Sequence, residues 1–547
     1  MNSKKRKGSK RLEKALRIAR LVLFFLQIIT AAALIVETMI FAILPGKYVL
    51  VMIMGLCFAA LLSFLLLTVS KKRRDMIIGC IWALLWILIC VLAVVLYLEP
   101  ARKSLKKVTN KEATETIHVT GISVLVRKDD KAQKLEETNG YVYGIQTSED
   151  YAFSLGAYEY IAKMNGMNIT VKEFEYYDNL AQALINKEID AMIADTSYLE
   201  MLNEYSEGFS GNYRILSELD VESEFPKSDI SVTPTPTEFE VMPTIDPDNP
   251  DITPEPGGEK NPTGAPAKPT PTPIVQKTPM PDRGEFSVTE DYFIVYISGI
   301  DCYGTIDARS RSDVNILMVV NPTTGKIQMV TVPRDSYVPL AGFGGGSYDK
   351  LTHAGLYGVK TSMNTLDNLF GIKTDYYVRV NFSSVERFVD LLGGVDIYSP
   401  IAFTSHDGQN TFTAGWNHVN GKRALSFARE RYAFQGGDFQ RGKNQMDLIK
   451  AVFGKMTSTA ALTNFPNLMS QVSNNFQTNM TMDQLTALCR MQLDRGISWS
   501  IDTYAVTASG GNAFCYSYKG SKLYVAYLNS DSVKEAASKM RAVMEGR

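Results

Sequence analysis

The chain has 547 residues, a formal net charge of −1 and six cysteines. This length is enough for two to four domains. The cysteines show no CxxC spacing, so we do not expect a zinc site. Acidic and basic residues are nearly balanced, and the basic N-terminal tail is explained by its position beside a predicted membrane span, so we expect no nucleic-acid partner.

Three apolar runs near the N-terminus are each long enough to cross a hydrocarbon core of about 30 Å: Leu21–Leu44, Tyr48–Ser70 and Met76–Leu98. A cleaved signal peptide would need one shorter run with a cleavage site. Residues 1–20 carry nine Lys or Arg, and residues 71–74 are all basic. Because basic loops stay cytoplasmic, we expect a multi-pass membrane protein with a cytoplasmic N-terminus and everything after Leu98 outside the cell.

Residues 117–220 predict a small α/β lobe. Strand patterns occur at four places: Ile122–Val126, Tyr143–Gln146, Ile169–Phe174 and Ile189–Ala194. Helical patterns occur between or after them: Tyr151–Met164, Asn179–Asn186 and a helix from Ser197. This alternation predicts a parallel sheet. The stretch DNLAQALINKEIDAMIAD resembles part of one lobe of a type 2 periplasmic solute-binding protein. Such proteins bind ligands between two lobes and this chain has room for one, so we expect a structural or partner-docking role, with small-molecule capture as the alternative.

Residues 226–281 hold 15 of the 22 prolines of the chain, with many Thr, Asp and Glu. This composition cannot bury enough apolar surface to offset the entropy of ordering, so we expect a disordered linker over residues 226–284. Pro-Thr repeats favour extended polyproline II, and fifty-odd residues in that conformation span on the order of 150 Å. We therefore interpret the segment as a tether.

Two carboxylates stand at the adjoining ends of two predicted strands. Asp301 follows the strand Phe293–Ile297, and Asp313 precedes the strand Val314–Val320. Two arginines lie in the loop between them: Arg309 and Arg311. Mg²⁺ is usually held by one or two carboxylates plus substrate phosphates, and arginines bind phosphate oxygens. The alternative is a polar loop whose charges simply pair at the surface.

The following segment adds two more candidates. The strand Ile327–Val332 forms a predicted hairpin with the preceding one and leads to Arg334. The Gly-rich loop at residues 342–346 lacks the Walker lysine pattern, so we expect a flexible loop there. A helix is predicted from Lys350 to about Phe370. His353, near its start, is a candidate base because its unperturbed pKa lies near neutrality, with a structural role as the alternative.

A predicted strand over Tyr376–Phe382 contains Arg379, and Ser383 or Ser384 is expected to cap the helix that follows. A second polar cluster then falls within seventeen residues: Arg429, Arg431, Asp438, Arg441 and Gln445. The last two residues are four apart in a helix predicted to begin at Asp438, so they share one face. Arginines grouped with carboxylates in this way suit a polyanionic substrate such as a pyrophosphate.

The motifs GID, RSD, VPRDS, KLTHA, YYVRVNF, LLGGVDIYS, GWNHVNGKRALSFARERY and GGDFQRGKNQ occur in this order. Together they closely resemble the LytR–CpsA–Psr family, over roughly Phe286–Ser458. The resemblance implies an α/β/α sandwich with a mixed sheet, spanning residues 286–547, and an apolar pocket for a polyprenyl tail. It also implies a phosphotransferase at the outer face of a bacterial cell membrane, which moves a glycopolymer from a polyprenyl-pyrophosphate carrier to peptidoglycan.

The same resemblance implies roles for single residues. Asp301 and Asp313 would hold Mg²⁺. Five arginines would bind the pyrophosphate: Arg311, Arg334, Arg429, Arg431 and Arg441. Asp438 and Gln445 would support them, and Arg379 occupies a position where the family has a basic residue near the lipid phosphate. From their own positions in the sequence, we also expect Arg309 and His353 to contact the substrate. Cys302 departs from the polar residue more usual in the family after the first Asp, which makes metal-linked thiol chemistry worth excluding.

We therefore expect Mg²⁺-dependent transfer of a glycopolymer to peptidoglycan through a phosphodiester bond, with the metal and guanidinium groups neutralising charge on the leaving phosphate. Two alternatives remain. Water in place of the sugar hydroxyl would give a polyprenyl-pyrophosphate glycan hydrolase. A non-catalytic sensor of lipid-linked wall precursors would use the three spans to signal inward. The sequence leaves open whether the polymer is a teichoic acid, a capsule or another glycan.

The composition of residues 226–281 generates one prediction. Replacing them with a scrambled Pro/Thr/Glu segment of equal length should preserve attachment of polymer to the wall in cells, because a tether depends on length rather than order. Shortening the segment to about ten residues should lower attachment in cells yet leave turnover of soluble substrate analogues intact. Loss of attachment with the scrambled segment, in a protein still folded and membrane-bound, would identify a binding motif instead.

Overall fold

The structure is a computed structural model that describes residues 2–41, 44–70, 72–100, 102–103, 118–147, 151–206, 208–223, 280–281, 283–300, 306, 310–342, 347–406, 408–434, 437–463, 465, 468, 471 and 476–547. Most of the predicted linker and most of the Gly-rich loop at residues 342–346 lie outside this description, as do Asp301, Cys302 and Arg309.

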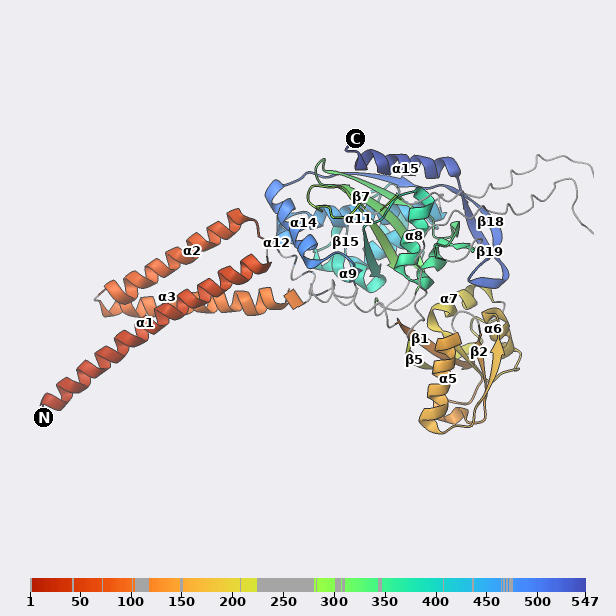
Figure 1. Ribbon diagram of the computed structural model, residues 1–547, viewed down its shortest axis with the longest axis horizontal. Helices are drawn as coiled ribbons and strands as arrows, with labels where there is room; N and C mark the ends of the chain where they lie inside the picture. Colours follow the sequence, from red (N-terminus) through yellow and green to blue (C-terminus); the bar gives the residue numbers. More distant parts are fainter. Residues whose placement is uncertain are drawn as a thin grey trace, which may run out of the picture.

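The N-terminal part forms three long helices that lie side by side (Figure 1). They are α1 (Asn2–Phe41), α2 (Gly46–Phe64, prolonged by a π-helical turn Leu65–Val69) and α3 (Arg73–Leu92, prolonged by Ala93–Leu98). Windows of membrane-spanning length and apolarity cover Leu16–Ile40, Gly46–Val69 and Arg73–Leu96. Most of their large apolar side chains face outward, which in a membrane places them against lipid. The three predicted spans are thus confirmed as helices of suitable length and composition.

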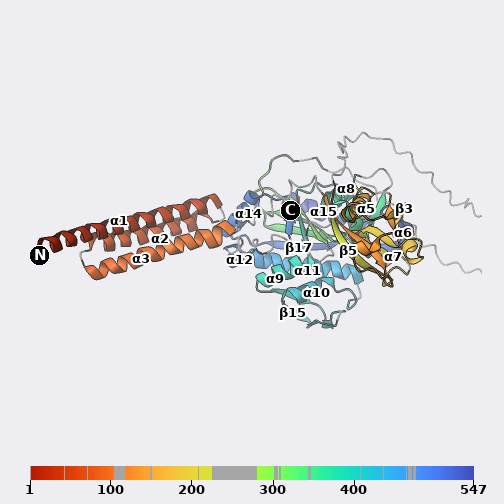
Figure 2. The ribbon, with the colours of Figure 1, turned by 90° about the horizontal axis from the view of Figure 1, so that it is seen from below.

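The helix bundle contacts the C-terminal domain at one end. Lys47, at the start of α2, lies with its Nζ 3.4 Å from Asp494 Oδ1. An apolar cluster joins the two parts: Leu34, Leu56, Cys90 and Leu98 with Leu462, Phe465, Cys489 and Leu493. The N-terminus and the α2–α3 connection lie at the opposite end of the bundle (Figures 1 and 2). The two basic segments therefore lie at the end of the bundle that is remote from the C-terminal domain.

The lobe after the membrane helices contains a five-stranded sheet in the order β3-β2-β4-β1-β5. Its strands are β1 (His118–Arg127), β2 (Val142–Gln146), β3 (Thr170–Phe174), β4 (Ala191–Asp195) and β5 (Tyr213–Ser223). Its helices are α5 (Tyr151–Asn165), α6 (Tyr177–Ile185) and α7 (Thr196–Tyr205), with a short 3₁₀ turn at Leu135–Thr138.

All four predicted strands of the lobe are confirmed, but the prediction of a parallel sheet is wrong. Strand β2 is parallel to β3 and β4, whereas β1 is antiparallel to β4 and to β5. Strand β5 was not predicted, because its charged positions (Arg214, Glu218 and Asp220) interrupt the apolar pattern, although it pairs along the whole of β1. A strand that returns beside β1 at the edge makes the sheet mixed.

The C-terminal domain is built on a six-stranded sheet in the order β16-β11-β6-β7-β8-β17. The strands are β6 (Phe293–Ile300), β7 (Ser312–Asn321), β8 (Lys326–Thr331), β11 (Tyr376–Asn381), β16 (Phe476–Thr478) and β17 (Ser500–Ala505). The hairpins β6–β7 and β7–β8 are antiparallel, while β11 is parallel to β6 and β17 is parallel to β8. The mixed sheet and the predicted β7–β8 hairpin are confirmed.

Helices cover both faces of this sheet (Figure 2). On one face, α8 (Val359–Phe370) and α15 (Ser530–Met544) pack against strand residues such as Tyr296 and Leu317. On the other, α11 (Gly437–Met456) and α14 (Met482–Arg495) pack against residues such as Val295 and Ile316. Neighbouring residues of one strand point to opposite faces, so the nearly uninterrupted apolar strands fit a sheet buried on both sides.

Smaller elements surround the sheet. Short strands pair as β9 (Tyr337–Pro339) with β10 (Tyr348–Lys350), β12 (Val395–Ser399) with β15 (Gly415–Val419), β13 (Phe403–Thr404) with β14 (Thr411–Phe412), and β18 (Ala508–Cys515) with β19 (Tyr518–Leu528). The remaining helices are α9 (Phe382–Leu391), α10 (Gly421–Arg429) and α12 (Thr459–Thr463).

Two helix predictions need correction. The helix expected from Lys350 to Phe370 is divided into a 3₁₀ segment, η5 (Leu351–Tyr357), and α8, because Gly358 adopts φ +102° between them. Helix α9 is capped by Asn381 rather than by Ser383 or Ser384. The Asn381 side chain accepts a hydrogen bond from the backbone of Ser384, whose side chain accepts one in return from the backbone of Asn381.

Parallel and antiparallel pairing together bring five strand ends to one edge of the sheet. The C-terminal ends of β6, β8, β11 and β17 meet there with the N-terminal end of β7. Three predicted site residues lie near this edge: Asp313 at the start of β7, Arg334 shortly after β8, and Arg379 near the end of β11. Open sheets place ligands beyond the carboxyl ends of their parallel strands, so this edge is where a site is expected.

One buried carboxyl group at the end of α8 generates a stability prediction. Asp367 is 2% exposed, and its Oδ1 accepts hydrogen bonds from the backbone N–H and the hydroxyl of Thr374. Burial raises its pKa to about 6 although the bonds from Thr374 lower it. Because the pKa of Asp367 is higher in the folded state, its contribution to stability is fully present below the pKa of the unfolded state, near 3.8. That contribution is lost as the pH rises through about 6.

We therefore expect Asp367→Asn to remove a pH-dependent loss of stability worth about 3 kcal/mol or less. The measurement is the free energy of unfolding of both proteins between pH 4 and pH 7. Asp531→Asn, at a highly exposed carboxylate on α15, serves as the matched control and should leave the pH profile unchanged. An unchanged pH profile in Asp367→Asn would contradict the assignment.

Candidate functional site

A small pocket opens at the strand edge just described, and its lining comes from four separate segments. These are the start of β7, the end of β8 and the Pro-Arg turn after it, the first turns of α11, and the end of β17. Four of the predicted site residues line it together: Asp313, Arg334, Arg441 and Gln445. The fold thus brings together polar residues that are up to 132 positions apart in the chain (313 to 445).

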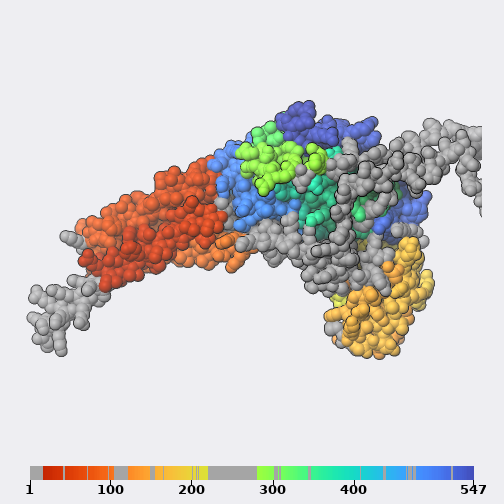
Figure 3. Space-filling view, viewed as in Figure 1, coloured from red at the N-terminus to blue at the C-terminus, as the bar shows by residue number. Residues whose placement is uncertain are grey.

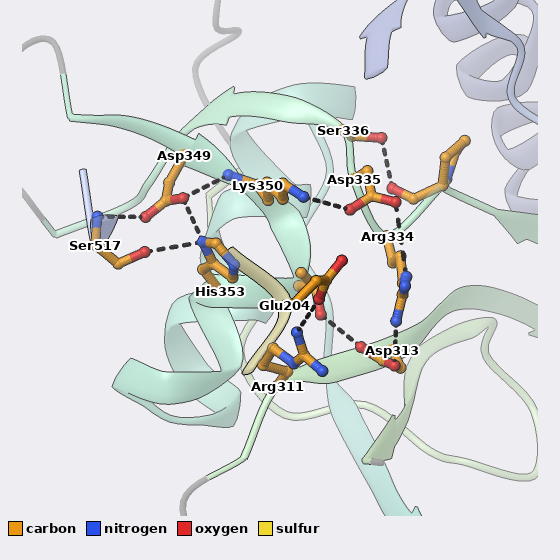
Figure 4. Close-up of polar contacts among 12 residues, drawn as sticks. Glu204, Arg311, Asp313, Arg334, Asp335, Ser336, Asp349, Lys350, His353 and Ser517 are labelled. Carbon is orange, nitrogen blue, oxygen red and sulfur yellow. Dashed lines mark hydrogen bonds and ion pairs between the residues drawn. The ribbon is translucent and has the colours of Figure 1, made fainter. Parts of the chain in front are cut away.

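Asp313 is the central carboxylate of this pocket (Figure 4). Arg334 Nη1 donates a 2.5 Å hydrogen bond to its Oδ2, and Thr352 Oγ1 donates a 2.7 Å bond to its Oδ1. Burial alone raises the pKa of Asp313, but the positive charges of Arg334 and Arg311 and the Thr352 bond outweigh it and lower the pKa to about 2. Asp313 is therefore an ionised carboxylate at neutral pH.

Arg334 is held by a chain of alternating charges that the sequence analysis did not identify (Figure 4). Its Nε lies 3.6 Å from Asp335 Oδ2, and Lys350 Nζ lies 3.1 Å from Asp335 Oδ1. Lys350 is only 2% exposed, so its charge depends on this partner. The sequence features that could have suggested these pairs are the adjacent arginine and aspartate of VPRDS and the lysine of KLTHA.

Close backbone packing places Thr352 beside Asp313. A Cβ at Gly355 of η5 would lie 2.6 Å from the backbone nitrogen of Ser312, so only glycine lets η5 approach the start of β7 this closely. On the other side, a Cβ at Gly442 would lie 3.1 Å from Thr331 Cγ2, where α11 crosses the end of β8. Both glycines therefore bring elements together around the pocket.

Arg311 is not among the residues that line the pocket, and it contacts the lobe. It is 8% exposed, and its Nη1 lies 3.2 Å from Oε2 of Glu204, in the last turn of α7 (Figure 4). Local sequence patterns did not predict this contact, because the two residues are 107 positions apart, on different domains.

The predicted Arg429 and Arg431 lie at the end of α10 and in the loop after it. The Arg429 guanidinium lies 4.3 Å from the centre of the Phe382 ring, and Arg431 Nη2 donates a 2.6 Å hydrogen bond to Tyr432. Between them, the buried Glu430 accepts backbone hydrogen bonds from residues 406, 431, 432 and 433. Burial raises the pKa of Glu430, but these bonds outweigh it and lower the pKa, so an ionised carboxylate shapes this loop.

Arg379 and His353 are both largely inside the protein. Arg379 Nη1 donates a 3.0 Å hydrogen bond to the carbonyl of Ile306, in the segment between β6 and β7. His353 is fully buried, and its Nδ1 lies 2.6 Å from Asp349 Oδ1 and 2.8 Å from Ser517 Oγ. A buried ring with these partners fits the structural alternative for His353 better than contact with a substrate.

Among the described residues, one group of three potential metal ligands lies close together: Asp349, His353 and Cys515. Burial raises the pKa of the Cys515 thiol, and the neighbouring Asp349 raises it further, so the sulfur is protonated at neutral pH. His353 and Asp349 are hydrogen-bonded to each other and to Ser517, so we describe this group as a hydrogen-bonded core cluster. Cys489 and Cys515 are both free cysteines.

Three of the predicted positions remain without a described side chain. Asp301 and Arg309 lie outside the described residues, and Asp438 lies in the first turn of α11, where only the backbone is described. Their roles in holding Mg²⁺ or phosphate stay predictions.

Comparison with known proteins gives one family. Residues 267–535 match the LytR_cpsA_psr family. Over 197 residues the chain is 36% identical to the polyisoprenyl-teichoic acid–peptidoglycan teichoic acid transferase TagU of Bacillus subtilis (strain 168), covering 36% of this chain and 62% of the relative. The protein of the same name from Enterococcus faecalis (strain ATCC 700802 / V583) is 32% identical over 196 residues, covering 35% and 63%. The chain thus spans less than two thirds of the length of these curated relatives.

Solved structures give similar matches. The crystal structure of B. subtilis TagV is 26% identical, with 47% of this chain and 98% of that chain covered and a TM-score of 0.40. A structure of TagT bound to LIIa-WTA is 25% identical, with 49% and 97% covered and a TM-score of 0.39.

The ion pair at the centre of the pocket generates a prediction. Arg334→Gln should destabilise the protein by about 3 kcal/mol or more at pH 7, because it leaves the largely buried Asp313 carboxylate with one fewer positive partner. It should also raise the pKa of Asp313, because the Arg334 charge that lowers this pKa against the effect of burial is then missing. The measurements are denaturant unfolding and NMR titration of the Asp313 side chain.

Arg495→Gln is the matched control, because the Arg495–Glu290 pair is exposed at both ends and should contribute no more than about 1 kcal/mol. Equal effects of the two substitutions, with no change in the pKa of Asp313, would contradict the central position of this pair.

Proposed function

Because residues 267–535 form a LytR_cpsA_psr family domain, as the motifs predicted, we propose that the chain transfers a glycopolymer from a polyprenyl-pyrophosphate carrier to peptidoglycan. The product would be a phosphodiester between the polymer and the wall. Relatives named as teichoic acid transferases support the reaction class. The observation that carries the proposal for this chain is the pocket in which Asp313, Arg334, Arg441 and Gln445 lie together.

The pocket has the charge pattern that a pyrophosphate ester needs. Guanidinium groups donate to phosphate oxygens in a fixed, planar geometry, and two of them line the pocket from different segments: Arg334 after β8 and Arg441 on α11. Gln445, one turn after Arg441, adds a neutral amide on the same helix face. Attack on the pyrophosphate develops negative charge on the leaving phosphate, so contacts that tighten there would lower the barrier by about 2–4 kcal/mol each.

Mg²⁺ is part of the proposal. Asp313 fits it chemically, since this carboxylate is ionised and lines the pocket beside the proposed phosphate site. Asp301 would be the second carboxylate. When bound, the ion would neutralise charge on the phosphate oxygens. Thr352 and Arg334, which hydrogen-bond the two Asp313 oxygens, keep this carboxylate oriented toward the pocket.

We further propose that the C-terminal domain works on the outer face of the membrane. Basic residues 1–20 and 71–74 belong to the end of the helix bundle remote from that domain, and basic segments stay cytoplasmic. The apolar cluster that joins the bundle to the domain, with the Lys47–Asp494 contact beside it, places the domain at the other end of the bundle, near a lipid carrier. The apolar pocket for the polyprenyl tail and the role of the linker stay predictions.

The function can be tested with full-length protein in proteoliposomes, supplied with a polyprenyl-pyrophosphate glycan, peptidoglycan fragments and Mg²⁺. We expect polymer covalently attached to peptidoglycan, abolished by chelation and by Asp313→Asn. Arg441→Lys should lower kcat by about 10²–10³-fold if the lost guanidinium contact tightens in the transition state. Arg541→Lys, on α15 at the opposite face of the sheet, is the matched control and should keep full activity.

The products separate the alternatives. Free phosphorylated glycan without attached polymer would identify a hydrolase, and unchanged substrate would favour a sensor. Full transfer by Asp313→Asn in the presence of a chelator would contradict the metal assignment.

A further inference from the structure

The lobe that follows the membrane helices docks beside the proposed active site. Figures 1 and 3 show it beside the C-terminal domain, and in Figure 1 the helices α6 and α7 lie next to the β18–β19 hairpin. One apolar cluster spans the contact, with Tyr177, Tyr198, Leu199 and Leu202 from the lobe and Leu356, Cys515, Tyr518, Leu523 and Val525 from the domain. Tyr518 also donates a 3.1 Å hydrogen bond from its Oη to Asp178 Oδ1. These contacts hold α7 in place.

Docking brings one acidic side chain of α7 to a predicted phosphate ligand. Glu204 Oε2 lies 3.2 Å from Nη1 of Arg311. Arg311 precedes Asp313 by two residues, and its charge helps to lower the pKa of that carboxyl group. The guanidinium therefore acts on the electrostatics of the pocket while one of its nitrogens is engaged by the lobe.

Arg311 and Glu204 differ in burial, and this difference decides which of them can move when an anionic ligand arrives. Arg311 is 8% exposed, whereas the side chain of Glu204 is 45% exposed. A half-exposed glutamate at the end of a helix can rotate into solvent at little cost, while the buried guanidinium stays in place. An anionic ligand that approaches Arg311 would therefore displace the glutamate without moving the arginine or undocking the lobe.

We propose that Glu204 is a positioning residue that the lobe supplies to the active site. It holds and partly neutralises Arg311 in the empty site, and it competes with phosphate oxygens for that guanidinium. Every phosphate ligand that uses Arg311 is then bound more weakly than in a site without Glu204, which shortens the residence time of the carrier phosphate after transfer. This role rests on the proposed function, because it takes Arg311 as a phosphate ligand.

The proposal also gives the lobe a function that needs no ligand of its own. A solute-binding lobe closes on its ligand with a second lobe, whereas here the helical face of a single lobe packs on the catalytic domain and presents a carboxylate to it. The acid at position 204 then sets the affinity of the site from outside the catalytic domain.

The test is calorimetric binding of inorganic pyrophosphate with Mg²⁺ to the detergent-solubilised full chain. We expect Glu204→Gln to tighten binding by about two- to fivefold, the value of a partly exposed ion pair. In transfer assays the same variant should lower KM and leave the chemical step unchanged. Glu159→Gln, which removes a glutamate from an exposed ion pair on α5 of the same lobe, is the matched control and should bind as the wild type does.

A double-mutant cycle with Arg311→Gln separates the possible failures. The proposal requires that Arg311→Gln weaken binding and that Glu204→Gln give no gain in that background. If Arg311→Gln weakens binding but Glu204→Gln alone leaves it unchanged or weaker, the competition is wrong while the phosphate site stands. If Arg311→Gln binds pyrophosphate as the wild type does, Arg311 is not a phosphate ligand, and both its assigned role and the proposal fail. Melting temperatures of all variants show that each one is folded.

Discussion

The structure of the site depends on the ionised carboxylate of Asp313 and on the two groups that hydrogen-bond it. Arg334 and Thr352 each engage one oxygen, and they reach it from different segments, the turn after β8 and the η5 helix. A buried carboxylate without such partners would be protonated or strongly destabilising. The β7–β8 register, the close approach at Gly355 and the buried Lys350–Asp335 pair are all needed to satisfy this one charge.

The arginines around Asp313 also explain how a pocket for an anion can have a carboxylate at its centre. Arg334, Arg311 and Arg441 all act on Asp313, so the local charge is positive despite the acid. Glu204 of the lobe reduces that excess from one side. The C-terminal domain contacts the lobe through one apolar cluster and the ends of the membrane helices through another. Through Glu204, the lobe reaches a residue two positions from Asp313.

Much of this was predictable from local patterns. Apolar runs predicted the strand that begins beside Asp313 and the strand that precedes Arg334, and the grouping of charged residues predicted Arg441 on α11. Contacts between distant segments were not predictable, because residue type does not reveal that Lys350 is buried against Asp335 or that Glu204 meets Arg311. Local patterns also led to two errors. Asn381 rather than a serine caps α9, and β5 was not predicted because its charged positions interrupt the apolar pattern.

The central claim is that the pocket around Asp313 holds the phosphate end of a polyprenyl carrier. The most direct measurement is native mass spectrometry of the full chain purified from bacterial membranes, compared with an Arg334→Gln, Arg441→Gln double variant. The account predicts a co-purifying polyprenyl phosphate or pyrophosphate on the wild type and its loss from the variant, with the variant still folded. The same lipid in equal amounts on both proteins, or none on either, would contradict it.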